Sequence, residues 1–355
     1  MQYLCTLHSG PAQALWLFAG MTKPHIALNS GRLGPANLSR RQSLTMKILI
    51  TEPMEAASVA ALSAKFETHH DAGLVDRRAQ LIAKLGDIDA LIVRNRTQVN
   101  AEILAAAPKL KVVGRLGVGL DNIDMPACKA RNLEVIPATG ANAQSVAEYV
   151  IATAMMLLRG AYFSTHATAA GTWLRPQLSN GREVGGKTLG IVGFGSIGRL
   201  TAGYAQGLGM RVIGSDPMIS ANSLVWSETK TTCRTLEQLL AESDVVSLHV
   251  PLMPETRNLI NAARLATMKP DAVLINSARG SIVDEPALAA ALKAKKLGGA
   301  ALDVFDDEPL KAGSALVDCP NLILTPHIAG VTAEANVRVS SMIAERVAAF
   351  LATAK

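Results

Sequence analysis

Short runs of apolar, β-branched residues alternate with Ala- and Leu-rich stretches of helical periodicity from Met46 onward. Most of the apolar runs have no polar face, which is typical of strands in a parallel sheet covered by helices on both sides. A chain of 355 residues is also long enough for two domains. We therefore predict an α/β protein of two Rossmann-like lobes, each a doubly wound parallel sheet, with a cleft between them. The expected strands are 47–51, 90–94, 111–115, 189–193, 211–215, 245–249, 272–276, 299–304 and 322–325.

Residues 1–45 do not follow this pattern. They show neither helical nor alternating periodicity, carry Gly, Pro and Ser throughout, and contain no Asp or Glu. An Arg-bearing, acid-free leader could be a targeting peptide, or the natural chain could begin at Met46, which opens the first apolar run. We favour the second alternative, because the leader has no clear amphipathic helix, and expect residues 1–45 to be disordered or spurious.

The composition restricts the class of protein. Apolar residues make up 49% of the chain and aromatic residues 4%, so the core must consist mainly of Ala, Val, Leu and Ile, which argues against an all-β sandwich. The net charge is +6, but four of these charges lie in the leader and no basic patch with interleaved aromatics follows, so we expect no nucleic-acid partner. No apolar run approaches the roughly 18 residues of a membrane span, so we expect a soluble protein without a membrane partner. The four cysteines are scattered, without a CxxC motif or a His at ligand spacing, which predicts reduced thiols, a cytoplasmic location and no metal site.

A glycine-rich turn follows the apolar run 189–193 and precedes a helical stretch. In Gly193-x-Gly195-x-x-Gly198 the first glycine permits a tight turn, the second lets the backbone approach a pyrophosphate, and the third brings helix and strand close together. A second strand ends at Asp216, eighteen residues beyond Gly198, where a carboxylate would accept hydrogen bonds from ribose hydroxyls. The combination predicts a site for NAD rather than NADP; the alternative role for Asp216 is to cap a turn before Pro217.

Three later segments each place one ionisable residue just past a predicted strand. They are 276–280 with Arg279, 303–309 with Glu308 and 325–330 with His327. Each residue alone has an ordinary explanation: a surface ion pair, a solvated turn residue and a loop histidine. Because the carboxyl ends of the strands of an open α/β sheet line a crevice, we expect the three side chains to share one site.

In this order after a Rossmann fingerprint, the segments resemble the D-isomer-specific 2-hydroxyacid dehydrogenase family, and within it the phosphoglycerate dehydrogenases, from about Met46 to the C-terminus. The resemblance implies that Arg279 binds the substrate carboxylate and 2-oxo group, that His327 is the acid/base, and that Glu308 pairs with His327. The residue types suit hydride transfer at C2. Histidine can take or give the hydroxyl proton, a carboxylate fixes its tautomer, and arginine binds a carboxylate bidentately.

The resemblance also implies a cofactor site and a substrate loop. Asp303 is expected to contact the nicotinamide amide, and Ser196 and Ile197 to offer backbone N–H groups to the pyrophosphate. In the other lobe, the backbone of Gly117-Val118-Gly119 is expected to receive the substrate carboxylate; phosphoglycerate dehydrogenases usually carry Thr where this chain has Val118, a departure that leaves the exact substrate open. The cofactor-binding residues implied are Gly193, Gly195, Ser196, Ile197, Gly198, Asp216, Val250, Pro251, Ala278, Asp303, His327 and Gly330.

Two arginines, Arg94 and Arg96, lie at the end of the predicted strand 90–94, in a segment that faces the distal anion in phosphoglycerate dehydrogenases. We hypothesise that Arg94, with Asn95 beside it, binds a second negative group such as phosphate or sulfonate. Arg96 shares this role or forms a solvated ion pair, because alternation places both arginines on one face. Sulfolactate, 3-phosphoglycerate and tartronate-like diacids are therefore the candidate substrates. A hydroxypyruvate or glyoxylate reductase and a non-catalytic, NAD-sensing corepressor-like protein are the alternatives.

The same resemblance divides the chain. The substrate domain is expected to comprise residues 46–142, the NAD-binding Rossmann domain residues 143–326, and a return to the substrate domain residues 327–355. The stretch 146–159 and the following 161–173 resemble a dimer arm, so we expect a homodimer.

Overall fold

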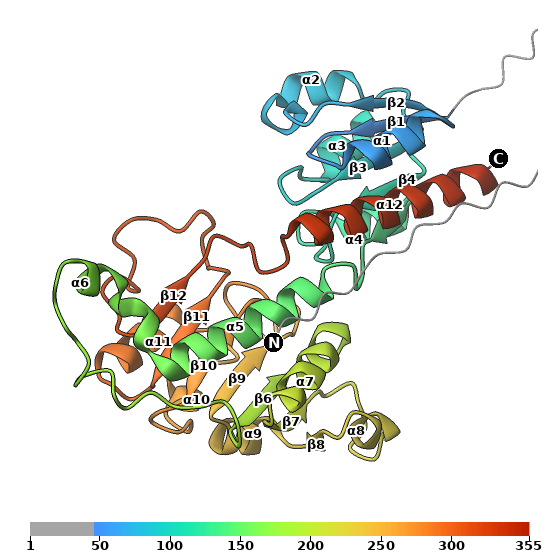
Figure 1. Cartoon of the computed structure of the whole chain (residues 1–355). Helices are drawn as coiled ribbons and strands as arrows, with labels where there is room; N and C mark the ends of the chain where they lie inside the picture. The colour runs from blue at the N-terminus through green and yellow to red at the C-terminus, as the bar shows by residue number, and fades with distance from the viewer. Residues whose placement is uncertain (1–45, 355) are drawn as a thin grey trace, which may run out of the picture. The chain divides into compact units, whose positions relative to one another are not determined.

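The computed structural model describes residues 46–354 and contains two parallel β-sheets covered by helices (Figure 1). The strand order is β2-β1-β3-β4-β5 in the five-stranded sheet and β12-β11-β10-β9-β6-β7-β8 in the seven-stranded sheet. Every strand pair is parallel. The predicted α/β class with two doubly wound sheets is therefore confirmed, whereas the prediction for residues 1–45 lies outside the described residues.

The first sheet is built from the N-terminal part of the described chain. Its central strands are buried at all but one end residue of β1 and one of β4, because both faces are covered, in agreement with their apolar sequences. The strands are β1 (Lys47–Ile50), β2 (Glu67–His70), β3 (Ala90–Val93), β4 (Val112–Arg115) and β5 (Glu134–Pro137), and the helices between them are α1 (Ala56–Ser63), α2 (Arg78–Ala83), α3 (Ala101–Ala106) and α4 (Met125–Ala130), with a short 3-10 turn, η1 (Leu74–Asp76).

The second sheet follows the same alternation with longer connections. Its strands are β6 (Thr188–Val192), β7 (Arg211–Ser215), β8 (Thr232–Cys233), β9 (Val245–Leu248), β10 (Val273–Asn276), β11 (Gly299–Leu302) and β12 (Leu322–Leu324). Its helices are α7 (Ser196–Gly207), α8 (Leu224–Glu228), α9 (Leu236–Glu242), α10 (Ala262–Leu265) and α11 (Glu285–Lys293).

Two long helices connect the sheets. Helix α5 (Ala143–Arg159) packs against α7, β10 and β11 of the second sheet, and the short η2 (Ala161–Ser164) and α6 (Thr165–Ala169) follow it. The last helix, α12 (Ala333–Thr353), packs against α1, β4 and β5, so the C-terminal end of the chain lies on the first sheet (Figure 1). A Cβ at Gly114 of β4 would lie 2.8 Å from Ile343 and 2.9 Å from Val347, so the glycine permits this close packing.

Three strands were missed by the hydrophobic pattern, and all are sheet edges. Strand β2 has the polar, mostly exposed sequence Glu-Thr-His-His, β5 ends in a proline, and β8 has only two residues. Edge strands are short and polar because one of their sides is not paired. The other predicted strands lie within two residues of the observed bounds.

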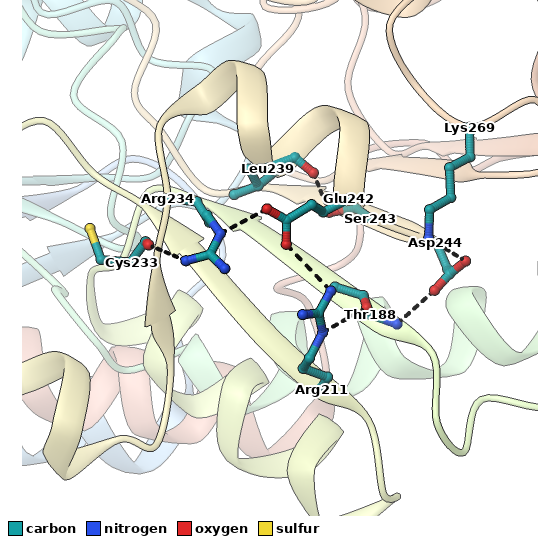
Figure 2. A network of polar contacts seen from close by, with 9 residues as sticks. All are labelled: Thr188, Arg211, Cys233, Arg234, Leu239, Glu242, Ser243, Asp244 and Lys269. Atoms are coloured by element: carbon teal, nitrogen blue, oxygen red, sulfur yellow. Dashed lines mark hydrogen bonds and ion pairs between the residues drawn. The ribbon is translucent and has the colours of Figure 1, made fainter.

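A polar network joins the amino ends of β6, β7 and β9 in the second sheet (Figure 2). Glu242 binds Arg234 at 2.8 Å and Arg211 at 3.4 Å, and these contacts lower the pKa of its carboxyl group. Burial raises the pKa of Asp244, but the Thr188 N–H, at 2.8 Å, and Lys269, at 3.0 Å, outweigh that effect and lower it. The network therefore fixes the edge opposite the carboxyl ends of the strands.

Two further features concern the described residues only. Cys128 is buried, Cys233 and Cys319 are half-buried, and none of the three forms a disulfide. No single helix within residues 46–354 is both long and apolar enough to cross a membrane. Helix α5 reaches that length and apolar composition only together with residues 161–169, and the helix axis bends by 69° between the two segments.

Candidate active site

A cavity of about 660 Å³ lies at the carboxyl ends of strands from both sheets. The loops after β3 and β4 form one wall, and the loops after β6, β9, β10, β11 and β12 form the other. This is the position at which open α/β sheets bind ligands, because the strand order leaves a crevice there. Apart from Gly193, Asp216 and Glu308, every residue expected to bind cofactor or substrate or to act in catalysis lines the cavity.

The glycine-rich turn between β6 and α7 is shaped by packing at two of its three glycines. A Cβ at Gly193, where φ is +91°, would lie 2.7 Å from the His249 carbonyl oxygen, and a Cβ at Gly198 would lie 2.5 Å from the Gly193 carbonyl oxygen. A Cβ at Gly195 would meet no heavy atom within 4 Å. The turn thus leaves open space at the amino end of a 12-residue helix, where N–H groups and the helix dipole favour a phosphate.

The cavity wall also contains polar atoms that suit a dinucleotide. Within the described part of the chain, Ser277 Oγ and Asn142 Oδ1 are buried without a hydrogen-bond partner, and both residues line the cavity. Buried polar groups are normally paired, so these atoms fit a ligand that carries hydroxyl and amide groups. Together with the open turn at Gly195, they make the residues present compatible with NAD.

Asp216 lies just after β7, next to the glycine-rich turn. Its carboxylate accepts hydrogen bonds from the Phe194 N–H at 2.8 Å and the Met218 N–H at 2.9 Å. It thus has the turn-capping contacts that were the alternative to ribose binding. A carboxylate has about four acceptor positions, so the two roles are compatible.

His327 and Glu308 form a close pair. The distance from His327 Nδ1 to Glu308 Oε2 is 2.7 Å, and Glu308 Oε1 accepts a hydrogen bond from the Phe305 N–H at 3.2 Å. The two side chains are 43% and 36% exposed, so a substrate can reach the imidazole. With Nδ1 bonded to the carboxylate, Nε2 is the ring atom that remains for a substrate.

The loop that carries His327 is held by Asp303, which is 1% exposed. Its carboxylate accepts the N–H groups of Ile328 at 2.8 Å and Ala329 at 2.7 Å, and its carbonyl oxygen accepts the His327 N–H at 2.8 Å. His327 has a φ of +57°, a left-handed conformation that costs a non-glycine residue about 1 kcal/mol or more. The bonds from Asp303 hold this conformation.

A second contact anchors the same loop on helix α5. The Thr325 hydroxyl lies 2.6 Å from Asp303 Oδ1 and 2.7 Å from the Tyr149 hydroxyl. Burial raises the pKa of Tyr149 to about 12, so its hydroxyl stays protonated. The sequence analysis assigned Asp303 to the cofactor but did not find this anchoring role, nor any role for Tyr149.

Arg279 follows β10 and reaches the loop after β4. Its Nε lies 2.8 Å from Asp121 Oδ2, and a Cβ at Gly119 would lie 1.6 Å from Arg279 Nη2. A Cβ at Gly117 would lie 1.5 Å from Arg115 Nη1. The two glycines of the predicted substrate loop therefore make room for two guanidinium groups.

Arg94 and Arg96 point to different surroundings. Arg94 lines the cavity, and its Nη2 lies 2.7 Å from Asn336 Oδ1 at the start of α12. Arg96 forms an ion pair with Asp76, and both side chains are 58% exposed. The solvated ion pair is therefore the observed arrangement for Arg96.

Arg115 is a site residue that the sequence analysis did not single out. Its guanidinium is largely buried beside the cavity, and its Nε has no hydrogen-bond partner among the described residues. Burial, and then the charge of Arg279, lower its pKa to about 10, so it keeps its charge at neutral pH. Its position at the end of β4 matches that of Arg94 after β3, and this likeness was the available signal.

Comparison with known proteins identifies the family. The model for the NAD-binding domain of D-isomer specific 2-hydroxyacid dehydrogenases matches residues 151–329. The chain is 53% identical to an (S)-sulfolactate dehydrogenase of Chromohalobacter salexigens over 300 residues, which are 84% of this chain and 96% of that protein. It is 39% identical to a D-3-phosphoglycerate dehydrogenase of Synechocystis over 88% of this chain, but spans only 55% of that protein.

A solved structure agrees with this result. The D-lactate dehydrogenase of Aquifex aeolicus, complexed with NAD and lactic acid, matches 86% of this chain and 95% of its own with a TM-score of 0.74 and 29% identity. These proteins are dehydrogenases, which favours an enzyme over the corepressor-like alternative. The chain belongs to the D-isomer-specific 2-hydroxyacid dehydrogenase family, as an NAD-dependent enzyme.

Proposed function

We propose that this dehydrogenase acts on a small 2-hydroxy acid that carries a second anionic group, of the size of 3-sulfolactate or 3-phosphoglycerate. The observation that carries the proposal is the pair of arginines, Arg94 and Arg115, that accompanies Arg279 at the cavity. One guanidinium suffices for the carboxylate of a 2-hydroxy acid. The relatives named for sulfolactate and 3-phosphoglycerate, both of which have two anionic groups, support the same conclusion.

The charges around the cavity favour a dianion. The charged groups that act on Arg115 are two further arginines, Arg94 and Arg279, and two carboxylates, Glu52 and Asp121. The cluster therefore holds an excess of positive charge within a partly enclosed site, where electrostatic attraction is stronger than in water. A neutral distal group would leave Arg94 and Arg115 without an anion.

In this proposal Arg279 binds the carboxylate and polarises the 2-oxo group, and the backbone of Gly117-Val118-Gly119 receives the carboxylate. The glycine-rich turn between β6 and α7 would hold NAD, which would supply the acceptor or donor of the hydride at the substrate C2. His327 Nε2 takes the hydroxyl proton during oxidation and returns it during reduction. Glu308, 2.7 Å from Nδ1, fixes the tautomer and stabilises the protonated ring.

We also infer the domain organisation and a dimer. Residues 46–142 and 327–355 form the substrate domain, which agrees with the packing of α12 on the first sheet, and residues 143–326 form the NAD-binding domain. Tyr162, Phe163 and Trp173, after α5, are 57%, 47% and 73% exposed, which suits a contact with a second copy. Light scattering of the purified protein tests the dimer.

The substrate proposal is tested by an Arg94→Ala variant. The 2-oxo acids 3-sulfopyruvate and 3-phosphohydroxypyruvate, which have a second anion, are compared with hydroxypyruvate, which lacks one, by following NADH oxidation. Loss of a partly desolvated charge pair costs about 2 kcal/mol, so kcat/KM for the dianionic acids should fall roughly thirtyfold. The value for hydroxypyruvate should change by less than about threefold, the effect of roughly 0.6 kcal/mol.

Arg96→Ala is the matched control, because it removes the same side chain from the same loop but from an exposed ion pair with Asp76. It should leave both values unchanged. An Arg94→Ala enzyme that keeps the wild-type preference for dianionic acids would refute the proposal. A wild-type enzyme that favours hydroxypyruvate would point to a hydroxypyruvate or glyoxylate reductase.

A further inference from the structure

Glu52 is a buried carboxylate just outside the cavity, at the carboxyl end of β1. Glu52 is 1% exposed, and it forms no salt bridge within the described residues. Its Oε1 accepts the N–H groups of Arg94 at 2.8 Å and Thr97 at 2.9 Å, and its Oε2 accepts the Arg96 N–H at 3.1 Å. Burial of a carboxylate is costly unless such bonds replace its hydration.

The three hydrogen bonds fix the loop that begins at Arg94. On the other side of this loop, Asn122 Nδ2 donates to the carbonyl oxygens of Arg94 at 3.2 Å and Thr97 at 2.7 Å. The Thr51 and Thr97 hydroxyls are 2.9 Å apart. The N–H and the carbonyl of Arg94 are therefore both held by buried side chains, and its Cα has little freedom to move.

The fixed backbone determines where the Arg94 guanidinium lies. With the Cα held, the side chain reaches Asn336 Oδ1 at 2.7 Å and lines the cavity beside Arg115. Glu52 also contributes a negative charge that acts on this cluster. Its attraction raises the pKa of Arg115 against the opposing effects of burial and of Arg279 and Arg94.

We propose that Glu52 is a positioning residue that determines substrate specificity: it orients Arg94 toward the second anion of the substrate without contacting the substrate itself. The role rests on the proposed function, because it requires that Arg94 binds this anion. It predicts that the preference for dianionic over monoanionic 2-oxo acids depends on a side chain outside the cavity.

The decisive variant is Glu52→Gln, which keeps the size of the side chain. If the amide oxygen takes the place of Oε1, its NH2 group faces the Arg96 N–H; if the amide is flipped, the NH2 group faces the N–H groups of Arg94 and Thr97. Either way donors oppose donors and the loop must shift. A misplacement of about 1 Å can cost up to roughly a hundredfold in rate.

The measured quantity is the ratio of kcat/KM for 3-sulfopyruvate, or 3-phosphohydroxypyruvate if that is the better substrate, to kcat/KM for hydroxypyruvate. This ratio does not depend on the fraction of enzyme that is folded. Glu52→Gln should lower it about tenfold, through a higher KM for the dianionic acid. Glu102→Gln, which removes an exposed carboxylate from the same lobe, is the control and should leave the ratio unchanged.

A double-mutant cycle separates positioning from support of the fold. If Glu52 acts through Arg94, Glu52→Gln should change the ratio by less than about twofold in an Arg94→Ala background. A parallel loss of activity toward both kinds of substrate, or an equal effect of Glu52→Gln with and without Arg94, would overturn the role. Should Glu52→Gln yield no folded protein, Glu52→Asp, which keeps the charge but is too short to reach all three N–H groups, is measured in the same way.

The cycle also distinguishes a failure of the proposed function from a failure of the role of Glu52. If Arg94→Ala alone leaves the ratio unchanged, the proposed function is wrong, because Arg94 does not bind a second anion. If Arg94→Ala lowers the ratio and neither Glu52 variant does, the proposed function stands and only the role of Glu52 is wrong.

Discussion

His249, in the cavity wall, makes stability depend on pH in a calculable way. It follows β9, lies beside the glycine-rich turn, and its Nε2 is 2.9 Å from Ser247 Oγ. Burial lowers its pKa to about 4 in the folded protein. In the unfolded chain the group returns to a pKa near 6.5.

Whether acid raises or lowers the free energy of unfolding depends on which state, folded or unfolded, binds more protons. Between about pH 6.5 and about pH 4 the unfolded chain protonates His249 and the folded protein does not, so acidification stabilises the unfolded state. The free energy of unfolding is therefore unaffected by His249 above about pH 7 and falls as the pH drops through this window. At about pH 5 the two pKa values correspond to a loss of roughly 2 kcal/mol.

The assay is urea denaturation of the wild type and of a His249→Gln variant, at about pH 7 and about pH 5. Other groups that titrate contribute equally to both proteins, so the difference between them isolates His249. The wild type should lose roughly 2 kcal/mol more than the variant on acidification. An identical pH dependence in the two proteins would show that the imidazole is already solvated and would refute the reasoning.

Two further predictions concern the active-site loops. Tyr149→Phe removes the hydroxyl that lies 2.7 Å from Thr325 Oγ1, so the free energy of unfolding should fall by about 1 kcal/mol. The value of kcat should decrease, while NADH affinity, measured by fluorescence titration, is retained. An unchanged kcat would contradict the anchoring of the His327 loop. Gly119→Ala places a Cβ where Arg279 now lies, so kcat/KM should fall at least about tenfold for dianionic and monoanionic acids alike. NADH affinity should again be retained. Wild-type kinetics in this variant would contradict the role proposed for Arg279.

The fold was predictable where strands are central and failed where they are edges. The runs at 189–193 and 272–276 are apolar because both faces of these strands are covered, and this leaves a clear signal in the sequence. Strand β2, with the sequence Glu-Thr-His-His, pairs on one side only and has no such signal. Its pairing with β1 is decided by the packing of the whole lobe, which local sequence does not encode.

The site was predictable where chemistry follows a strand within a known motif. The glycine-rich turn, Arg279 and His327 were predicted in this way, and the structure brings them together at the cavity. The partners of Arg94 and Arg96 were not, because alternation places both side chains on one face and only long-range contacts separate them: Arg94 binds Asn336, 242 positions away, and Arg96 binds Asp76 at the surface. Glu52 was missed for the same reason, since its partners are backbone N–H groups more than 40 positions away.

The two halves of the active site share one structural solution. Each places a side chain of the proposed site on an irregular loop, Arg94 after β3 and His327 after β12. Each holds that loop with a carboxylate that is 1% exposed and follows a neighbouring strand, Glu52 after β1 and Asp303 after β11. An irregular loop leaves backbone N–H groups without partners, and a buried carboxylate can accept several of them at once through bonds that are each stronger than a neutral hydrogen bond. Removing either carboxylate charge therefore displaces a functional group rather than deleting it. Such variants should lose specificity in the case of Glu52, and turnover in the case of Asp303, before they lose the fold.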